Sequence, residues 1–140
     1  VPLIANWPGV INTGKVSEDL IDFSDFLPTL CEAATIEIPA ELAIDGRSFL
    51  PLLKGEDYQP REWIYCWYSR SGVEAQQWAR TQRYKLYPDG KLYDISQDRL
   101  EKTPLSALSP EAQQARATLQ GVLDQFKDAR PAPLASAKKK

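Results

Sequence analysis

The sequence predicts an α+β fold, a small antiparallel sheet of about four strands packed by a C-terminal helix and preceded by a strand-helix segment. Three observations lead to this prediction. Short aromatic and β-branched runs between turn residues fill the middle of the chain. One amphipathic helical pattern with signals at both ends follows them. The first 60 residues combine an apolar run with two shorter helical patterns.

The N-terminal segment begins with apolar residues 1–7, which predict a short strand ended by a Pro-Gly pair. Apolar spacing between residues 17 and 34 is helical, but Pro28 cannot lie deep inside a helix. With Ser24 or Asp25 as the N-cap, Pro28 falls in the first turn, where no intrahelical bond is lost. The predicted buried stripe of this helix then consists of Leu27, Leu30, Cys31 and Ala34.

A second, shorter helical pattern follows. Asp45-Gly46 predicts a turn, Ser48 is a candidate cap, and one apolar turn ends at Gly55. Asp25 is interpreted as a helix cap rather than a catalytic carboxylate, because a cap aspartate before an apolar run is common.

Residues 62–69 are aromatic and apolar on both faces, which predicts a central strand covered above and below. Three further strands are predicted at 77–82, 84–87 and 91–95. The last two are joined by Pro88-Asp89-Gly90, a turn sequence. Together these runs predict the small antiparallel sheet.

The clearest helix opens with Ser109 as cap and Pro110 at its first position. Its apolar stripe should cover one face of the sheet, and it comprises Ala112, Ala115, Leu119, Val122, Leu123 and Phe126. Beyond it, residues 129–140 are poor in large apolar side chains, and we expect a disordered tail.

Composition excludes several classes of function. The 140 residues carry a net charge of −2, which gives no reason to expect a nucleic acid partner, and no apolar run is long enough to suggest a membrane partner. The chain has no His to act as an acid or base. Its two cysteines, Cys31 and Cys66, are expected to be buried free thiols, although the sequence does not decide their redox state.

Four short stretches occur in an order and spacing that resemble the C-terminal part of the arylsulfatase family. They are Val1-Pro-Leu-Ile-Ala-Asn-Trp-Pro-Gly9, Asp25-Phe-Leu-Pro-Thr-Leu30, Asp45-Gly-Arg-Ser-Phe-Leu-Pro51 and Arg83-Tyr-Lys-Leu-Tyr87. The similarity covers about residues 1–128. Two departures are Thr35, where Gly often follows the helix, and Arg99, where Pro is usual.

This resemblance implies an alkaline-phosphatase-like α/β enzyme that hydrolyses sulfate esters. Its nucleophile is a formylglycine and its metal is calcium, and both belong to motifs that normally precede the segment found here. We therefore expect no catalytic residue and no metal ligand in this chain. Cys66-Trp-Tyr-Ser-Arg70 looks like the formylglycine signature, but Tyr68 replaces its Pro and the match lies in a predicted buried strand. It is interpreted as a packing cysteine.

Substrate-binding residues are a separate question, because loops of the family's C-terminal domain can reach the rim of the active-site cleft. Arg70, in the loop 69–74, is a candidate partner for an anionic sugar or sulfate, and Trp78 for a sugar face. The competing interpretations are a surface arginine and a core tryptophan, which are the commoner cases.

The leading hypothesis is a C-terminal sulfatase fragment that completes the fold and cleft rim and is inactive alone. Residues 1–60 would then be the end of the catalytic domain and 61–128 the sheet-and-helix subdomain. Its partners would be the missing catalytic domain and, by self-association, further copies of the fragment; the parent would act on a sulfated ester or glycan, in the periplasm, the lysosome or outside the cell. The alternative is a non-catalytic carbohydrate-binding or interaction module that has kept this architecture.

Overall fold

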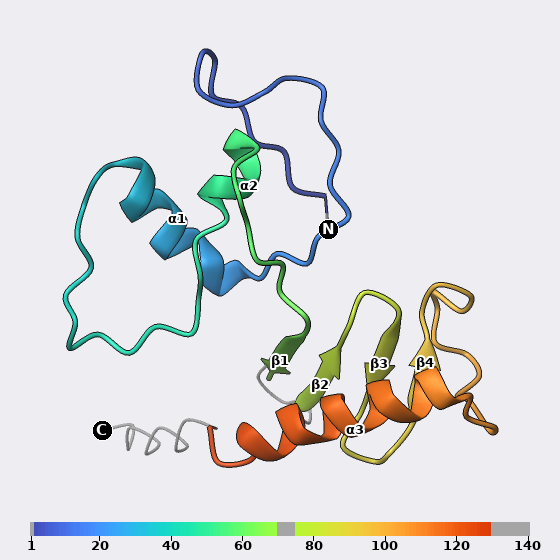
Figure 1. Ribbon diagram of the computed structural model, residues 1–140. Helices are drawn as coiled ribbons and strands as arrows, with labels where there is room; N and C mark the ends of the chain where they lie inside the picture. Colours follow the sequence, from blue (N-terminus) through green and yellow to red (C-terminus); the bar gives the residue numbers. More distant parts are fainter. Residues whose placement is uncertain (1, 70–74, 130–140) are drawn as a thin grey trace, which may run out of the picture. The chain divides into compact units, whose positions relative to one another are not determined.

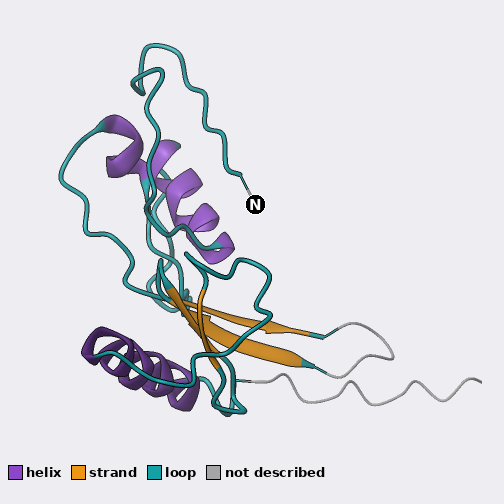
Figure 2. Cartoon of the chain, turned by 90° about the vertical axis from the view of Figure 1, so that its right-hand side faces the viewer, coloured by secondary structure: helices purple, strands orange, loops and turns teal. Residues whose placement is uncertain are grey.

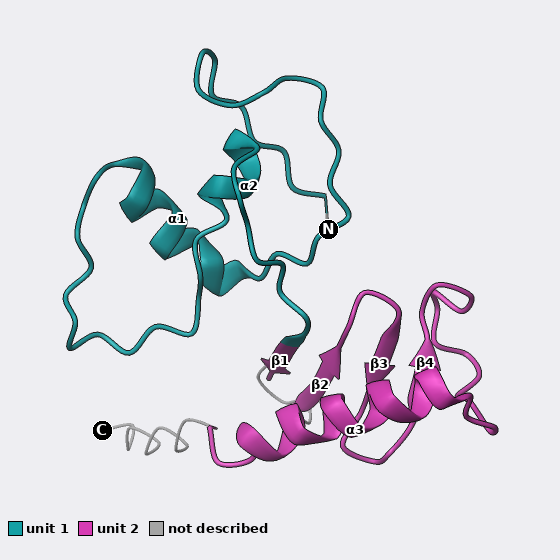
Figure 3. Ribbon diagram, viewed as in Figure 1, with its two compact units in different colours: residues 1–64 teal, residues 65–140 magenta. Residues whose placement is uncertain are grey.

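The computed structural model describes residues 2–69 and 75–129, and the chain forms two compact units, residues 1–64 and 65–140 (Figure 3). Unit 1 contains a short 3-10 helix and two α-helices. Unit 2 contains a four-stranded antiparallel sheet and one long helix (Figure 1). The predicted α+β fold class is confirmed. The assignment of residues 1–60 to a catalytic domain stays a prediction, and the expected tail at 129–140 lies, apart from Ala129, outside the described residues.

The first helical segment of unit 1 begins earlier than predicted. A 3-10 helix, η1 (Phe23–Asp25), runs directly into α1 (Phe26–Ala33). Its cap is Asp22, whose carboxylate accepts a hydrogen bond from the Ser24 amide at 2.9 Å. Asp25 is the N-cap position of α1, as predicted, but its side chain makes no capping hydrogen bond to that helix. Pro28 does lie in the first turn of α1, as its missing amide hydrogen requires.

The predicted buried stripe of α1 is wrong as well. Leu27 is 53% exposed and Leu30 64%, whereas Pro28 and Thr29 are buried. The Thr29 hydroxyl donates to the Asp25 carbonyl at 2.6 Å and accepts from the Phe49 amide at 3.0 Å. These bonds turn the Thr29 face of α1 toward the segment before α2, so the leucines point away from the core of this unit.

At the C-terminus of α1 lies Thr35, which replaces the glycine that often follows this helix in the arylsulfatase family. The amide of Ile36 donates to the Cys31 carbonyl at 2.8 Å, and that of Thr35 to the Glu32 carbonyl at 3.1 Å. This is a Schellman ending, which places Thr35 in the left-handed region at φ 54°. Glycine adopts that conformation without steric cost, whereas threonine does not.

Helix α2 (Leu50–Lys54) ends at Gly55 as predicted, but its N-cap position is Phe49 and not the candidate Ser48. The Ser48 hydroxyl accepts from the Leu50 amide at 3.1 Å, and Gly55 ends the helix at φ 76°. Two other expectations are wrong. Residues 2–7 form no strand, since no described segment pairs with them, and Asp45-Gly46 does not form a turn. A Cβ at Gly46 would overlap the Ser24 carbonyl oxygen, so close approach of two backbones explains this glycine.

Unit 2 is built on four strands in the order β1-β2-β3-β4. Their bounds are Ile64–Tyr68, Gln76–Arg80, Tyr84–Leu86 and Leu92–Asp94. Strand β1 lies at an edge of the described sheet and is only half-buried, so the predicted central position is wrong. The β3–β4 hairpin turns at Pro88-Asp89-Gly90 as predicted, with Gly90 at φ 83°.

Helix α3 (Pro110–Gln125) lies along one face of this sheet (Figure 2). The Ser109 hydroxyl caps it by accepting from the Ala112 amide at 3.2 Å, as the sequence predicts. The aromatic rings of Tyr65 and Phe126 stack at 4.5 Å between centroids. The buried apolar core between helix and sheet comprises Ala79, Tyr84, Leu86, Leu92, Ala112, Leu119, Val122 and Leu123.

Candidate functional site

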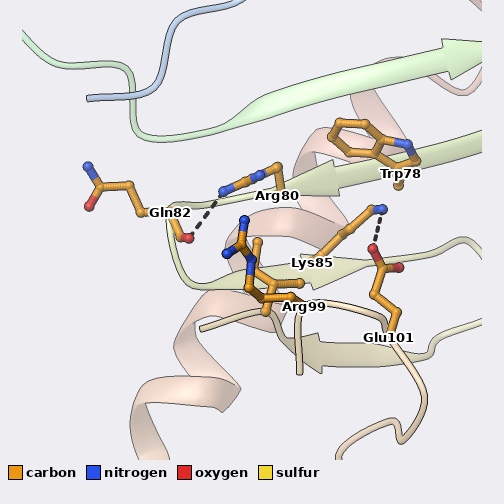
Figure 4. Close-up of a pocket in the computed structure, with 7 residues that line it drawn as sticks. Trp78, Arg80, Gln82, Lys85, Arg99 and Glu101 are labelled. Carbon is orange, nitrogen blue, oxygen red and sulfur yellow. Dashed lines mark hydrogen bonds and ion pairs between the residues drawn. The ribbon is translucent and has the colours of Figure 1, made fainter. Parts of the chain in front are cut away.

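A polar pocket of about 350 Å³ opens in unit 2 (Figure 4). Strand alternation places it on the sheet face opposite α3, because Ala79 and Leu86 point into the core while their neighbours Arg80 and Lys85 point away from it. The segment after β4 contributes the rest of its lining. Its lining consists of Trp78, Arg80, Gln82, Lys85, Ile95, Arg99 and Glu101.

Lys85 is a largely buried cation of this pocket, with its side chain 14% exposed. Its ammonium group forms an ion pair with Glu101 at 2.7 Å. It also lies 4.6 Å from the ring centroid of Trp78 and 4.9 Å from that of Tyr87. Both separations are within the range of cation–π attraction. Lys85 is thus held between two aromatic rings and a carboxylate, and its direction is fixed.

Glu101 is held by two donors. Besides Lys85, it accepts a hydrogen bond from the Tyr87 hydroxyl at 2.5 Å. Burial and this hydrogen bond raise the pKa of Tyr87 far above its ordinary value, so the phenol stays a donor. The backbone of Glu101 has φ 54°, which is unusual for a residue with a side chain. A strained backbone position that places a carboxylate in a pocket is a common feature of functional sites.

The other two cations of the pocket have no carboxylate partner among the described residues. Arg80 donates from Nε to the Thr81 carbonyl at 3.0 Å and from a terminal nitrogen to the Gln82 carbonyl at 3.2 Å. Burial lowers the pKa of Arg80, and the charge of Glu101 opposes that effect; an arginine remains charged at neutral pH. Arg99 is exposed and forms no hydrogen bond or ion pair with any residue that the structure describes.

Unit 1 contains a different polar centre, the buried carboxylate of Asp25. It pairs with the Arg61 guanidinium and accepts from the Arg47 amide at 2.9 Å and the Asp22 amide at 2.8 Å. Burial alone would raise the pKa of Asp25, but these hydrogen bonds and the Arg61 charge together hold it below its ordinary value. The carboxylate joins three separate segments and has no free lone pair facing solvent, so its role is structural.

The acidic residues after β4 also serve the fold. Asp94 binds the Arg83 guanidinium at 2.8 Å, which holds the pKa of Asp94 below its ordinary value despite burial. Arg83 reaches on to Glu111 of α3 at 2.7 Å. Asp98 accepts from the Thr103 amide at 2.8 Å. In residues 2–69 and 75–129, no group of three His, Cys, Asp or Glu side chains could hold a metal ion. The described residues therefore do not fit calcium, which needs several oxygen ligands in one place.

The two predicted binding residues have different outcomes. Trp78 lies in β2 and lines the pocket, while Arg70 falls outside the described residues. Cys66, which resembles the formylglycine signature, lies in β1; neither cysteine is in a disulfide within the described residues, and both are half-buried rather than buried. Sequence reasoning missed Arg80, Lys85, Arg99 and Glu101. Alternation along the two predicted strands could have found Arg80 and Lys85, whereas nothing local signals that Arg99 and Glu101 fold back onto them.

No helix in the described part of the chain is long and apolar enough to cross a membrane.

Comparison with known proteins gives a consistent result. Residues 1–129 match the family described as N-sulphoglucosamine sulphohydrolase, C-terminal. An ulvan-active sulfatase of Formosa agariphila is 45% identical over 65 residues, which are 46% of this chain and 13% of that protein. An N-acetylglucosamine-6-O-sulfatase of Bacteroides thetaiotaomicron is 29% identical over 94% of this chain and 26% of that protein. A steryl-sulfatase of Mus musculus is 30% identical over 56% of the chain and 12% of that protein.

Among solved structures, a putative sulfatase from Bacteroides thetaiotaomicron superimposes with a TM-score of 0.55 at 29% identity. The match covers 73% of this chain and 23% of that protein. The chain thus spans between about an eighth and a quarter of the length of these relatives. Because the family match extends over nearly the whole chain, the chain belongs to the sulfatase family and is the C-terminal portion of a sulfatase.

Proposed function

We propose that this chain completes the fold and the cleft rim of a sulfuric ester hydrolase that acts on sulfated saccharides, and that it has no activity alone. The observation that carries the proposal is the family match over residues 1–129, whose description is that of a C-terminal segment. One relative is named for activity on ulvan and another for the 6-O-sulfate of N-acetylglucosamine, and the second aligns with 94% of this chain. The steryl-sulfatase aligns with a smaller share.

Chemistry supports the assignment of catalysis to the rest of the parent. Sulfate ester hydrolysis in the resembling family needs an activated nucleophile and a hard cation held by carboxylates. This chain has no His, and its described residues hold no metal-binding cluster. We therefore assign the formylglycine and the calcium to the preceding catalytic domain. We also propose that the parent is exported to the periplasm, the lysosome or the outside of the cell.

Exposed apolar residues of unit 1 support the same proposal. Ile4 is 88% exposed, Leu30 64% and Leu27 53%. Such residues cost free energy in water unless another surface covers them. We propose that in the parent the preceding catalytic domain covers these residues.

The experiment compares this chain with its full reading frame. We expect an upstream Cys-x-Pro-Ser-Arg motif and an early Asp-Asp pair. We also expect the full protein, made with its maturation system and calcium, to release sulfate from N-acetylglucosamine-6-sulfate or from 4-nitrophenyl sulfate. The 140-residue chain alone should release none above the buffer blank. Calcium-dependent hydrolysis by the chain alone, or a full reading frame without these motifs, would overturn the proposal.

A further inference from the structure

We infer that the pocket on the open face of the sheet binds an anionic group carried on a saccharide, a sulfate or a carboxylate, between the guanidinium groups of Arg80 and Arg99. The saccharide part of this inference rests on the proposed function. The anionic part rests on the charges and contacts of the pocket itself.

Charge is concentrated at this pocket against the trend of the chain. Three cations and one carboxylate line it, a formal charge of +2, whereas the whole chain carries −2. The excess therefore arises from local placement and not from a generally basic composition. A concave site of one sign concentrates ligands of the opposite sign.

The excess positive charge belongs to Arg80 and Arg99. Glu101 is already committed to Lys85, at 2.7 Å, and to the Tyr87 hydroxyl, at 2.5 Å. Arg80 and Arg99 both line the pocket, and Figure 4 draws their guanidinium groups on one side of the view and the Lys85–Glu101 pair on the other. Neither arginine forms an ion pair with a carboxylate of the described residues, so a bound anion would supply the opposite charge that both lack.

Both groups retain donors for such an anion. Arg80 uses its guanidinium to bind two main-chain carbonyls on one side, which fixes its plane. Arg99 uses none of its donors on the described residues. The forked donor geometry of arginine matches the paired oxygens of a sulfate or carboxylate.

The pocket also offers an apolar wall for a sugar ring. Trp78 and Ile95 line it beside the cations. Lys85 covers one face of the Trp78 ring and keeps the indole oriented, so a sugar ring would contact the uncovered part of the indole together with Ile95. Carbohydrates combine apolar C–H faces with polar edges, and an aromatic side chain next to charged donors suits both.

The experiment titrates the ¹⁵N-labelled 140-residue chain with three probes at constant ionic strength. They are a heparin-derived tetrasaccharide, its chemically desulfated and carboxyl-reduced counterpart, and inorganic sulfate. The signals to follow are the arginine Nε–H groups and the indole N–H of Trp78. We expect the anionic tetrasaccharide to shift the signals of Arg80, Arg99 and Trp78 and to bind at least about tenfold more tightly than either other probe.

Arg99→Gln removes the unpaired cation, and Lys102→Gln is its matched control. Lys102 is exposed in the same segment and does not line the pocket, so both variants lose one positive charge. We expect Arg99→Gln to weaken the tetrasaccharide by about tenfold and Lys102→Gln by less than about twofold. Circular dichroism confirms that both variants are folded.

Four outcomes would overturn the inference. The tetrasaccharide does not bind, or its neutral counterpart binds as tightly. Arg99→Gln and Lys102→Gln weaken the binding of the tetrasaccharide equally, or inorganic sulfate binds as tightly as the tetrasaccharide, which would indicate a site for the free ion. Sulfate release by the full protein is measured separately. If the tetrasaccharide does not bind but the full protein releases sulfate, only the inferred binding site is refuted. If the full protein releases no sulfate, the proposed function is refuted.

Discussion

Single residues of unit 1 depend on partners that lie far away in the sequence. Asp25 and Arg61 are 36 positions apart, and both are buried. Their pair is supplemented by two backbone amides, so the carboxylate has the full set of donors that a buried charge requires. Removing one partner would leave the other charge buried and unpaired.

Asp25→Asn should lower the free energy of unfolding by about 3 kcal/mol at pH 7, because it strands the buried Arg61 guanidinium. Urea denaturation and the exchange protection of the Arg47 amide, which binds Asp25, measure the loss. Asp57→Asn removes the same charge from an exposed site and should change stability by less than about 0.5 kcal/mol.

The same pair predicts a pH dependence. The folded-state pKa of Asp25 is lower than its unfolded value, so its contribution is complete above about pH 4. It is lost as the pH falls through the folded-state pKa. The stability difference between wild type and Asp25→Asn should therefore shrink below about pH 4. A difference that stays constant from pH 7 to pH 2 would contradict this.

Thr35 carries a local cost that a single substitution can remove. Its φ of 54° is natural for glycine and strained for a β-branched residue. Thr35→Gly should raise the free energy of unfolding by about 1 kcal/mol. Ala33→Gly, inside α1, should lower it by about the same amount, since no positive φ favours glycine there. Loss of stability in Thr35→Gly, measured by thermal unfolding, would show that the hydroxyl matters more than the backbone.

At the scale of elements, two glycines differ in the space around them: one position excludes a side chain and the other admits one. Gly46 lies against the Ser24–Asp25 backbone, where a Cβ would overlap the Ser24 carbonyl, whereas Gly121 lies in α3 with open space around it. Gly46→Ala should destabilise unit 1 by more than about 2 kcal/mol. Gly121→Ala should stabilise α3 by about 1 kcal/mol. Hydrogen exchange resolved by residue assigns each effect, and an effect of Gly46→Ala below that of ordinary surface changes would refute the close contact.

Elements with local signals were predictable from the sequence. Ser109 and Pro110 start α3 and Gly90 turns the β3–β4 hairpin, because caps and turns depend on adjacent residues. The position of β1 at an edge was not predictable, since strand order depends on pairing between distant segments. The pocket was missed for the same reason, except for Trp78: the segment holding Glu101 must fold back beside β3 before its charge meets Lys85.

At the scale of the whole molecule, exposed apolar side chains are unevenly distributed. Among the described residues, the large apolar side chains that are exposed belong to unit 1, apart from Tyr68 and Leu100. Among the described residues of unit 1, the buried apolar side chains are Leu20, Pro28, Phe49 and Leu50, whereas unit 2 has a full layer between sheet and helix. Unit 2 therefore has the more complete apolar core, and unit 1 has the apolar surface that a binding partner would cover.

Self-association is the expected behaviour of the isolated chain, because no catalytic domain covers unit 1. Leu30→Asp places a charge at a residue that is 64% exposed, so it should leave the fold intact and lower the weight-average mass toward that of the monomer. Leu100→Asp, at 74% exposure in unit 2, makes the same change and should leave the mass at the wild-type value. Light scattering over a concentration series measures both. A wild-type chain that stays monomeric at high concentration would contradict the prediction, as would equal effects of the two variants, because the association would then not depend on unit 1.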